Sequence, residues 1–174
     1  MKRGLIILVL VLVITALVVP AYAEGEDWLP DIILDSSLDS TDQFLFTITR
    51  PEGDETTIYA TYVISGYAND QAITIQLLKQ NEDGEYVPFC NTDGESSWEV
   101  GAYGIFSKEV SLKEGANKIR VVAYKTDEID NLELGVNLQV NNFTVTRLND
   151  EIRQIFENGF IFRISEWLGN LSLR

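Results

Sequence analysis

Apolar and polar residues alternate along most of the chain between residues 44 and 140. Apolar side chains recur two or four positions apart in six segments, which is typical of strands with one buried face and one wet face. Turn residues separate these segments at 51–54, 68–70, 81–84 and 113–117. The pattern predicts a β-sandwich of about seven short strands. The alternating positions are Phe44, Phe46, Ile48; Ile58, Ala60, Tyr62, Ile64; Ile73, Ile75, Leu77; Phe106, Val110, Leu112; Ile119, Val121, Ala123; and Leu132, Leu134, Val136, Leu138, Val140.

Two groups of short motifs flank a long polar segment in this region. The first group reads TITRP-x-G at 47–53, ISG-x-AN at 64–69 and I-x-I at 73–75. The second reads G-x-FS-x-x-V-x-L at 104–112 and G-x-N-x-I-x-V-x-A at 115–123. In order and spacing they resemble the glucodextranase domain-B-like group of bacterial immunoglobulin-like (Ig-like) domains. The resemblance covers residues 44–146. It implies an all-β, Ig-like Greek-key sandwich that serves secreted or cell-surface proteins as a spacer, adhesion module or accessory domain, without catalytic residues.

The N-terminus has the pattern of a signal peptide over residues 1–23. Two basic residues precede a run from Leu5 to Val19 that is apolar except for one threonine. Ala21-Tyr22-Ala23 after it fits a signal peptidase site. The run is shorter than the ~20 residues that a membrane-spanning helix needs. We therefore expect cleavage after Ala23, secretion, and no membrane span in the mature protein. An uncleaved N-terminal anchor remains the alternative.

Residues 24–43 form an acidic arm rich in Asp, Ser and Glu. Its composition is that of a linker, yet it also contains several large apolar residues. We expect these residues to dock the arm against the sandwich, and contact with a partner is the alternative. They are Trp28, Leu29, Ile32, Ile33 and Leu34.

The charge balance and the rare residues narrow the class of function. The chain has 13 Lys and Arg against 27 Asp and Glu, and its net charge of −14 argues against a nucleic-acid partner. The absence of histidine removes His-based metal sites and catalytic triads. The single cysteine, Cys90, cannot form an internal disulfide; we expect it to be buried or inert, the alternative being a link between two chains. No pair of carboxylates is singled out for acid–base chemistry, so we expect no enzyme and no cofactor.

Three aromatic residues lie in the polar segment 79–104, where simple members of the resembled group have a short hairpin. Tyr86, Trp98 and Tyr103 are candidates for a sugar-stacking platform, because aromatic rings pair with the apolar face of a pyranose. The alternative is ordinary packing under a long loop. A weaker candidate is a Ca²⁺ site at Asp127, Glu128 and Asp130, whose oxygens suit a hard cation, and a solvated acidic turn is favoured over it.

The segment 147–174 extends beyond the resembled domain. Leu148, Ile152, Ile155 and Phe156 share one side of a helical wheel, and Asn158-Gly159 reads as the end of that helix. A second apolar stripe follows at a different angle, so the segment is predicted to be an amphipathic, mostly helical extension. It either caps the sandwich or docks on another protein. The docking candidates are Phe160, Ile164, Trp167 and Leu168.

Together these features predict a non-catalytic secreted or cell-surface Ig-like module with a binding or structural role. Its expected partner is an envelope protein or a glycan. One alternative is a carbohydrate-binding accessory module that uses the aromatic residues of segment 79–104. The other is a subunit that docks through its C-terminal extension.

Overall fold

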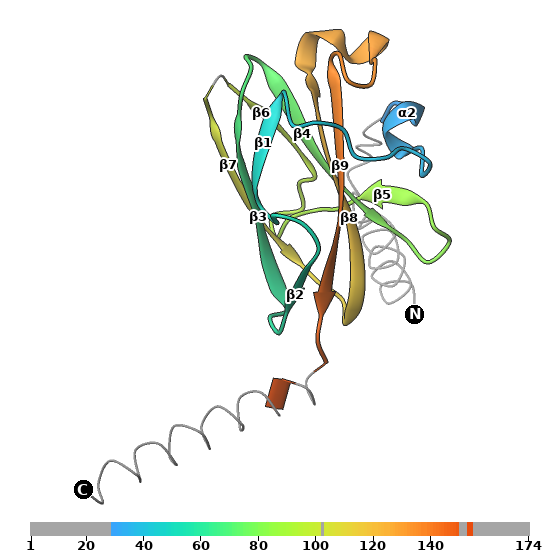
Figure 1. Cartoon of the computed structure of the whole chain (residues 1–174), viewed down its shortest axis with the longest axis vertical. Helices are drawn as coiled ribbons and strands as arrows, with labels where there is room; N and C mark the ends of the chain where they lie inside the picture. The colour runs from blue at the N-terminus through green and yellow to red at the C-terminus, as the bar shows by residue number, and fades with distance from the viewer. Residues whose placement is uncertain (1–28, 102, 150–152, 155–174) are drawn as a thin grey trace, which may run out of the picture.

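The computed structural model describes residues 29–101, 103–149 and 153–154, and nine strands lie in that part of the chain. They form two sheets that pack face to face (Figure 1). In chain order they are β1 (Phe46–Arg50), β2 (Glu55–Thr57), β3 (Thr61–Ala68), β4 (Ile73–Gln80), β5 (Tyr86–Pro88), β6 (Ser97–Val100), β7 (Ile105–Ser111), β8 (Gly115–Lys125) and β9 (Leu138–Arg147). The short helix α2 (Asp31–Leu34) precedes them, and the 3-10 helix η1 (Thr126–Asn131) joins β8 to β9.

The strand order identifies the fold class. The smaller sheet has the order β1-β3-β7, and the larger has the order β2-β9-β8-β4-β5, with β6 also paired to β4. Every strand pair is antiparallel except β2 with β9, which is parallel. These orders match strands A-B-E and G-F-C-C′ of an immunoglobulin sandwich. The predicted all-β, Ig-like Greek-key sandwich is therefore confirmed.

The core lies between the two sheets, where the predicted alternation placed most of it. The alternating row that begins at Ile58 is wrong in its first half, because β3 starts only at Thr61 and Ala60 is exposed. From the larger sheet, β4 and β8 supply alternate apolar side chains that are buried almost completely. From the smaller sheet, the rings of Phe46 and Phe106 meet edge to face with 5.7 Å between their centroids. The core includes Phe46, Ile48, Tyr62, Ile64, Ile73, Ile75, Leu77, Phe106, Val110, Leu112, Ile119, Val121 and Ala123.

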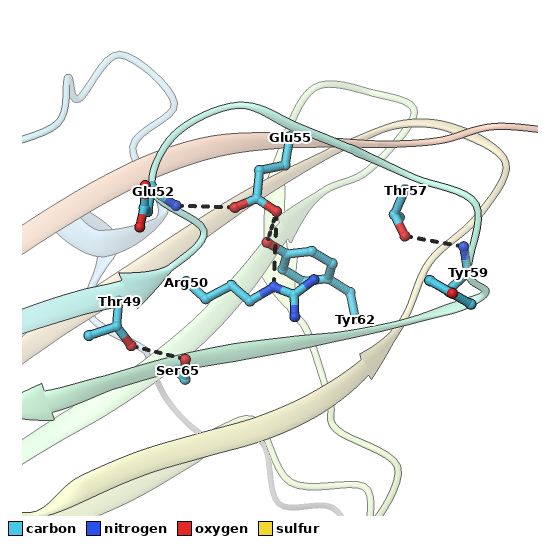
Figure 2. Close-up of polar contacts among 8 residues, drawn as sticks. All are labelled: Thr49, Arg50, Glu52, Glu55, Thr57, Tyr59, Tyr62 and Ser65. Carbon is cyan, nitrogen blue, oxygen red and sulfur yellow. Dashed lines mark hydrogen bonds and ion pairs between the residues drawn. The ribbon is translucent and has the colours of Figure 1, made fainter.

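Strands β1 and β2 are one run of chain that changes sheet at Pro51, which follows a cis peptide bond. At this corner Tyr62 donates a hydrogen bond of 2.7 Å from its hydroxyl to Glu55 Oε2, and the Arg50 guanidinium lies 4.7 Å from the centre of the Tyr62 ring (Figure 2). Burial raises the pKa of Tyr62 to about 12, and the hydrogen bond to Glu55 adds to the shift. Through these contacts Tyr62 of β3 holds the end of β1 and the start of β2 in place.

The N-terminal arm packs on the outer face of the larger sheet, beside β5, β8 and β9 (Figure 1). Ile33 is completely buried there. The expected docking is confirmed for Leu29, Ile32, Ile33 and Leu34, while Trp28 lies outside the described residues. The sheet contributes Leu78, Tyr86, Val122, Tyr124, Leu138 and Val140 to this second apolar cluster.

The predicted strand over 132–140 is wrong in its first half. Leu132 to Asn137 form a loop, and β9 begins only at Leu138. Gly135 has a φ of 80°, which a strand does not allow, and the Asn137 side chain holds the loop by accepting from the Glu133 N–H at 2.6 Å and donating to the Asn131 carbonyl at 3.0 Å. The apolar side chain of Val136 consequently points into solvent.

Cys90 was expected to be buried or inert; it is exposed, so the expected burial is wrong. It directly follows Phe89, which turns into the core as the chain leaves β5 for the opposite sheet. The predicted signal peptide and nearly all of the predicted C-terminal extension, including Phe160, Ile164, Trp167 and Leu168, lie outside the described residues. Within residues 29–149 no helix has the length and hydropathy to cross a membrane.

Candidate functional site

Three large apolar side chains are exposed together where β3 ends and β7 begins. Tyr67 is 44% exposed, Tyr103 86% and Ile105 85%. Tyr67 lies directly opposite Ile105 in the register of β3 and β7, and Tyr103 precedes Ile105 by two residues. We call Tyr67, Tyr103 and Ile105 the apolar corner. Clusters of exposed apolar side chains on a soluble domain commonly mark an interaction site.

Strand geometry explains why Tyr67 and Ile105 meet. The Ala68 N–H donates to the Gly104 carbonyl at 2.9 Å, so these two residues form a hydrogen-bonded pair. The next pair, Tyr67 and Ile105, is then a non-hydrogen-bonded pair, in which the two side chains approach more closely. Because Phe106 points into the core, its neighbour Ile105 points outward. The sequence carried this signal, since the alternation that buries Phe106 exposes Ile105, but the pairing with Tyr67 needed the register.

The turn between β6 and β7 presents Tyr103 to solvent. Gly104 donates its N–H to the Gly101 carbonyl at 2.9 Å, and Tyr103 has a φ of 57°, unusual for a bulky residue. A Cβ on Gly104 would lie 2.6 Å from Val100 Cγ1 and 2.8 Å from the Gly101 carbonyl oxygen. The lack of a side chain at Gly104 therefore allows the tight turn that holds Tyr103 outward.

A groove of about 480 Å³ runs beside the apolar corner, between the edge strands β6 and β7. Its lining combines apolar side chains from Trp98, Val100 and Phe106 with the main chain of Gly101 and Gly104. Trp98 and Val100 are only half-buried, although both pack against the inner core. An apolar side chain from a ligand would find partly open apolar surface here.

Trp98 itself is held by three neighbours. Its indole N–H donates to Glu95 Oε2 at 2.8 Å, and its ring meets Phe106 edge to face at 5.3 Å between centroids. Lys108 Nζ lies 4.8 Å from the ring centre and 3.9 Å from Glu95 Oε2. The indole is thus a wall of the groove, with one face already occupied by an ammonium group.

The three aromatic residues predicted as a platform are not brought together. Trp98 lies on β6 and Tyr103 in the turn that follows it, but Tyr86 is only 8% exposed and lies under the arm on the outer face of the larger sheet. The Arg120 guanidinium covers the Tyr86 ring at 3.8 Å. Tyr86 therefore packs as part of the arm contact, away from the groove.

The edge of β7 beside the corner has unpaired backbone groups. The Ala68–Gly104 hydrogen bond shows that even-numbered residues of β7 face β3, so the N–H and C=O groups of Ile105 and Ser107 point away from the sheet. Within the described residues nothing pairs with them. Further along, the Glu109 carbonyl accepts from the Thr92 N–H at 3.3 Å, which closes the edge there.

The edge of β1 on the other side of the smaller sheet is closed by a side chain. Gln139 Oε1 accepts from the N–H groups of Phe44, Leu45 and Phe46 at 2.9–3.0 Å, and Gln139 Nε2 donates to the Phe46 carbonyl at 2.7 Å. The neighbouring edge of β9 is closed by Thr41, whose N–H donates to the Val140 carbonyl at 2.8 Å. The open stretch at Ile105 and Ser107 is therefore a local feature of β7.

The three residues of the weak Ca²⁺ candidate all lie in the helix η1. Glu128 Oε2 accepts a hydrogen bond of 2.6 Å from Asn137 Nδ2, so that carboxylate braces the loop before β9. In the part of the chain that the structure describes, Asp127, Glu128 and Asp130 do not gather into a group that could hold a metal ion. In the structure the carboxylate of Glu128 thus holds the loop before β9 through Asn137.

No protein-family model matches the chain, and no curated protein does. Similar solved structures include WR4, a C. elegans member of the MSP family, at 8% identity and a TM-score of 0.39, covering 59% of this chain and 97% of that one. The class 5 fimbriae chaperone CfaA is 20% identical with a TM-score of 0.37, over 60% of this chain and 57% of that one. A chain of a chaperone–tip adhesin complex of CFA/I fimbriae is 14% identical with a TM-score of 0.38, over 60% of this chain and 58% of that one. The chain thus spans less than two thirds of the two fimbrial chains, and the likenesses concern overall fold alone.

Proposed function

We propose that this chain is a non-catalytic, secreted or cell-surface Ig-like binding module that holds its ligand at the apolar corner and the adjacent groove. The observation that carries the proposal is the joint exposure of Tyr67, Tyr103 and Ile105 beside a half-open groove. The signal-peptide pattern of residues 1–23 supports an extracellular site of action.

The arrangement of the two sheet faces supports this choice of surface. The outer face of the larger sheet is covered by the chain's own arm, with Ile33 at its centre. The smaller sheet has no such cover among the described residues, and the exposed side chains of Tyr67, Tyr103 and Ile105 lie at one end of it. Burying a side chain such as Ile105 stabilises a complex by about 1.5–3 kcal/mol, and a tyrosine adds area with little loss of conformational entropy.

Co-sedimentation with isolated cell envelopes tests the proposal. Purified protein from residue 24 onward is compared with the double variant Tyr103→Ser/Ile105→Ser. The matched control is Tyr59→Ser, which removes a 64% exposed tyrosine just ahead of β3, at the opposite end of that strand from the corner. We expect the double variant to lose most of its retention and the control to keep it, with both melting temperatures close to that of the parent protein.

Equal retention of the double variant and the parent protein would overturn the proposal. Retention that disappears only when residues 148–174 are removed would instead support docking through the C-terminal extension. Competition of retention by soluble glycans, with the double variant also defective, would identify the ligand as a carbohydrate that stacks on Tyr103.

A further inference from the structure

We infer that the ligand of this module is an extended polypeptide segment that adds to the free edge of β7 as an additional strand. The inference rests on the proposed function and names its ligand class. It starts from the N–H and C=O groups of Ile105 and Ser107, which point away from β3 and have no partner within the described residues. Such an edge is a template for another strand.

The contrast with the edges of β1 and β9 strengthens this inference. At the start of β1, Gln139 satisfies the N–H groups of Phe46 and of the two residues before it, and along β9 the arm supplies Ser40 and Thr41. These edges use side chains in place of a neighbouring strand, which prevents unwanted pairing. Among the residues that the structure describes, none provides a substitute of this kind at Ile105 and Ser107.

Side chains on both faces of an added strand would contact apolar surface of this protein. Side chains of successive strand residues point to opposite faces. One set would lie beside Ile105 and Tyr67 on the outer face of the smaller sheet. The alternate set would enter the groove over Trp98, Val100 and Phe106. The corner and the groove thus become the two side-chain contacts of one extended ligand.

Charge argues for a partner protein that carries basic residues. The charge of Lys108 is already engaged by Glu95 at 3.9 Å, while Glu99 and Glu109 are exposed on the strands that border the groove. The whole chain has a net charge of −14, so two copies repel each other. We therefore assign the site to a Lys- or Arg-bearing extended segment of another protein rather than to a second copy.

A proline tests strand addition directly, because proline has no N–H and cannot donate to a ladder. Ser107→Pro removes an N–H that points away from β3, so the native β3–β7 pairing is retained. Ser107→Ala is the matched control, since it keeps the main chain intact. Near-ultraviolet circular dichroism and the melting temperature report whether each variant folds.

The probe is the blocked peptide Lys-Val-Thr-Val-Thr-Val-Thr-Lys, and its binding is measured by calorimetry and by amide exchange of the isotope-labelled protein. A second peptide of the same sequence is N-methylated at every second residue, which removes the donors on one edge without changing the side chains. This comparison uses the unaltered protein and does not depend on the folding of a variant. A third peptide has Glu in place of Lys.

We expect the parent peptide to bind and to slow exchange of the Ile105 and Ser107 amides. N-methylation and Ser107→Pro should each weaken binding about tenfold or more, as expected for the loss of a main-chain hydrogen bond, whereas Ser107→Ala should stay within about twofold. The acidic peptide should bind more weakly than the basic one, and this difference should shrink at high salt.

Four results would overturn the inference, and the last of them leaves the proposed function intact. The first is failure of the peptide to bind at millimolar concentration, and the second is equal binding of the N-methylated peptide. The third is self-association of the protein that Ser107→Pro abolishes, which would make a second copy the occupant. If Ser107→Pro is retained on envelopes like the parent protein while Tyr103→Ser/Ile105→Ser is lost, the proposed function stands and strand addition falls.

Discussion

The guanidinium of Arg120 lies 3.8 Å from the centre of the Tyr86 ring and is completely buried between the arm and the larger sheet. Its Nη1 donates to the carbonyls of Ile33 and Asp35 at 3.0 and 2.7 Å, and its Nη2 to that of Leu38 at 3.2 Å. Burial lowers the pKa of Arg120, but an arginine keeps its charge. One cation thus satisfies three carbonyls of the arm and holds it on the sheet.

Replacing that cation should release the arm. Arg120→Met keeps much of the apolar volume but removes every donor, and it should lower the free energy of unfolding by about 3 kcal/mol. Urea unfolding measures the loss, and limited proteolysis should cut within residues 29–43. Lys118→Met, which changes an exposed side chain two positions earlier on β8, is the control. An Arg120→Met arm as protease-resistant as the parent's would show that the apolar contacts suffice.

Gln139 should be more important for stability than its single position suggests. Gln139→Leu leaves the buried N–H groups of Leu45 and Phe46 and the partly buried N–H of Phe44 without acceptors, at a cost of about 3 kcal/mol. Gln43→Ala is the comparison, because Gln43 accepts from one N–H alone, that of Ile48 at 2.8 Å. In chemical denaturation, Gln139→Leu should have a much lower free energy of unfolding than Gln43→Ala. Equal stabilities would mean that water replaces the lost acceptor.

Gly66 should tolerate no side chain. A Cβ at this position would overlap the Thr47 carbonyl oxygen and the Phe46 ring, and because the first of these is backbone, Gly66→Ala should destabilise the fold by about 3 kcal/mol. Gly53→Ala is the matched control, since nothing lies within 4 Å of the Cβ it would add. Thermal unfolding of both variants tests the difference. A melting temperature for Gly66→Ala equal to the control would contradict the register of β1 and β3.

The phenol of Tyr62 should make stability fall at alkaline pH. Its pKa is raised from 10.0 to about 12 by burial and by the hydrogen bond to Glu55, so the folded chain holds this proton more tightly than the unfolded chain. The contribution is complete below pH 10 and is lost as the pH rises through about 12. Unfolding free energies measured across this interval should fall less steeply for Tyr62→Phe. The same slope in both proteins would exclude Tyr62 as the cause.

Cys90 should react in the native protein. Its exposed thiol is expected to titrate with one equivalent of a disulfide reagent per chain without denaturant. Cys90→Ser should show no reaction. Reaction that requires denaturant would mean that the thiol is covered in solution.

Much of the core could be predicted from sequence because it depends on local periodicity. Ile73, Ile75 and Leu77 alternate on one strand, and strand geometry then sends all three to one face. The same argument failed at Leu132 to Val136, where Gly135 and the Asn137 side chain form a loop despite the alternation. The short strands β2, β5 and β6 were missed because three or four residues carry too little periodicity.

The candidate site was predicted only in part. Residue type singled out Tyr103 and Trp98, and they do lie close in the chain, on β6 and in the turn after it. Tyr86 was grouped with them because all three lie within one segment of 25 residues or so, but segment 79–104 crosses from the larger sheet to the smaller one and back. Tyr67 and Ile105 were not predicted, since their contact joins residues on two paired strands.

The sequence by itself determined the class of the fold, because apolar alternation and turn residues are read locally and admit few architectures. It also determined the acidic surface and the docking of the arm's apolar residues. Tertiary structure alone decided that the edges of β1 and β9 are closed and that the edge of β7 is open at Ile105 and Ser107 within the described residues. That distinction depends on Gln139 reaching Phe46 across 93 positions of sequence and on the register that turns Ile105 and Ser107 outward. Such long-range pairings are set by packing of the whole domain, so no local pattern reports them.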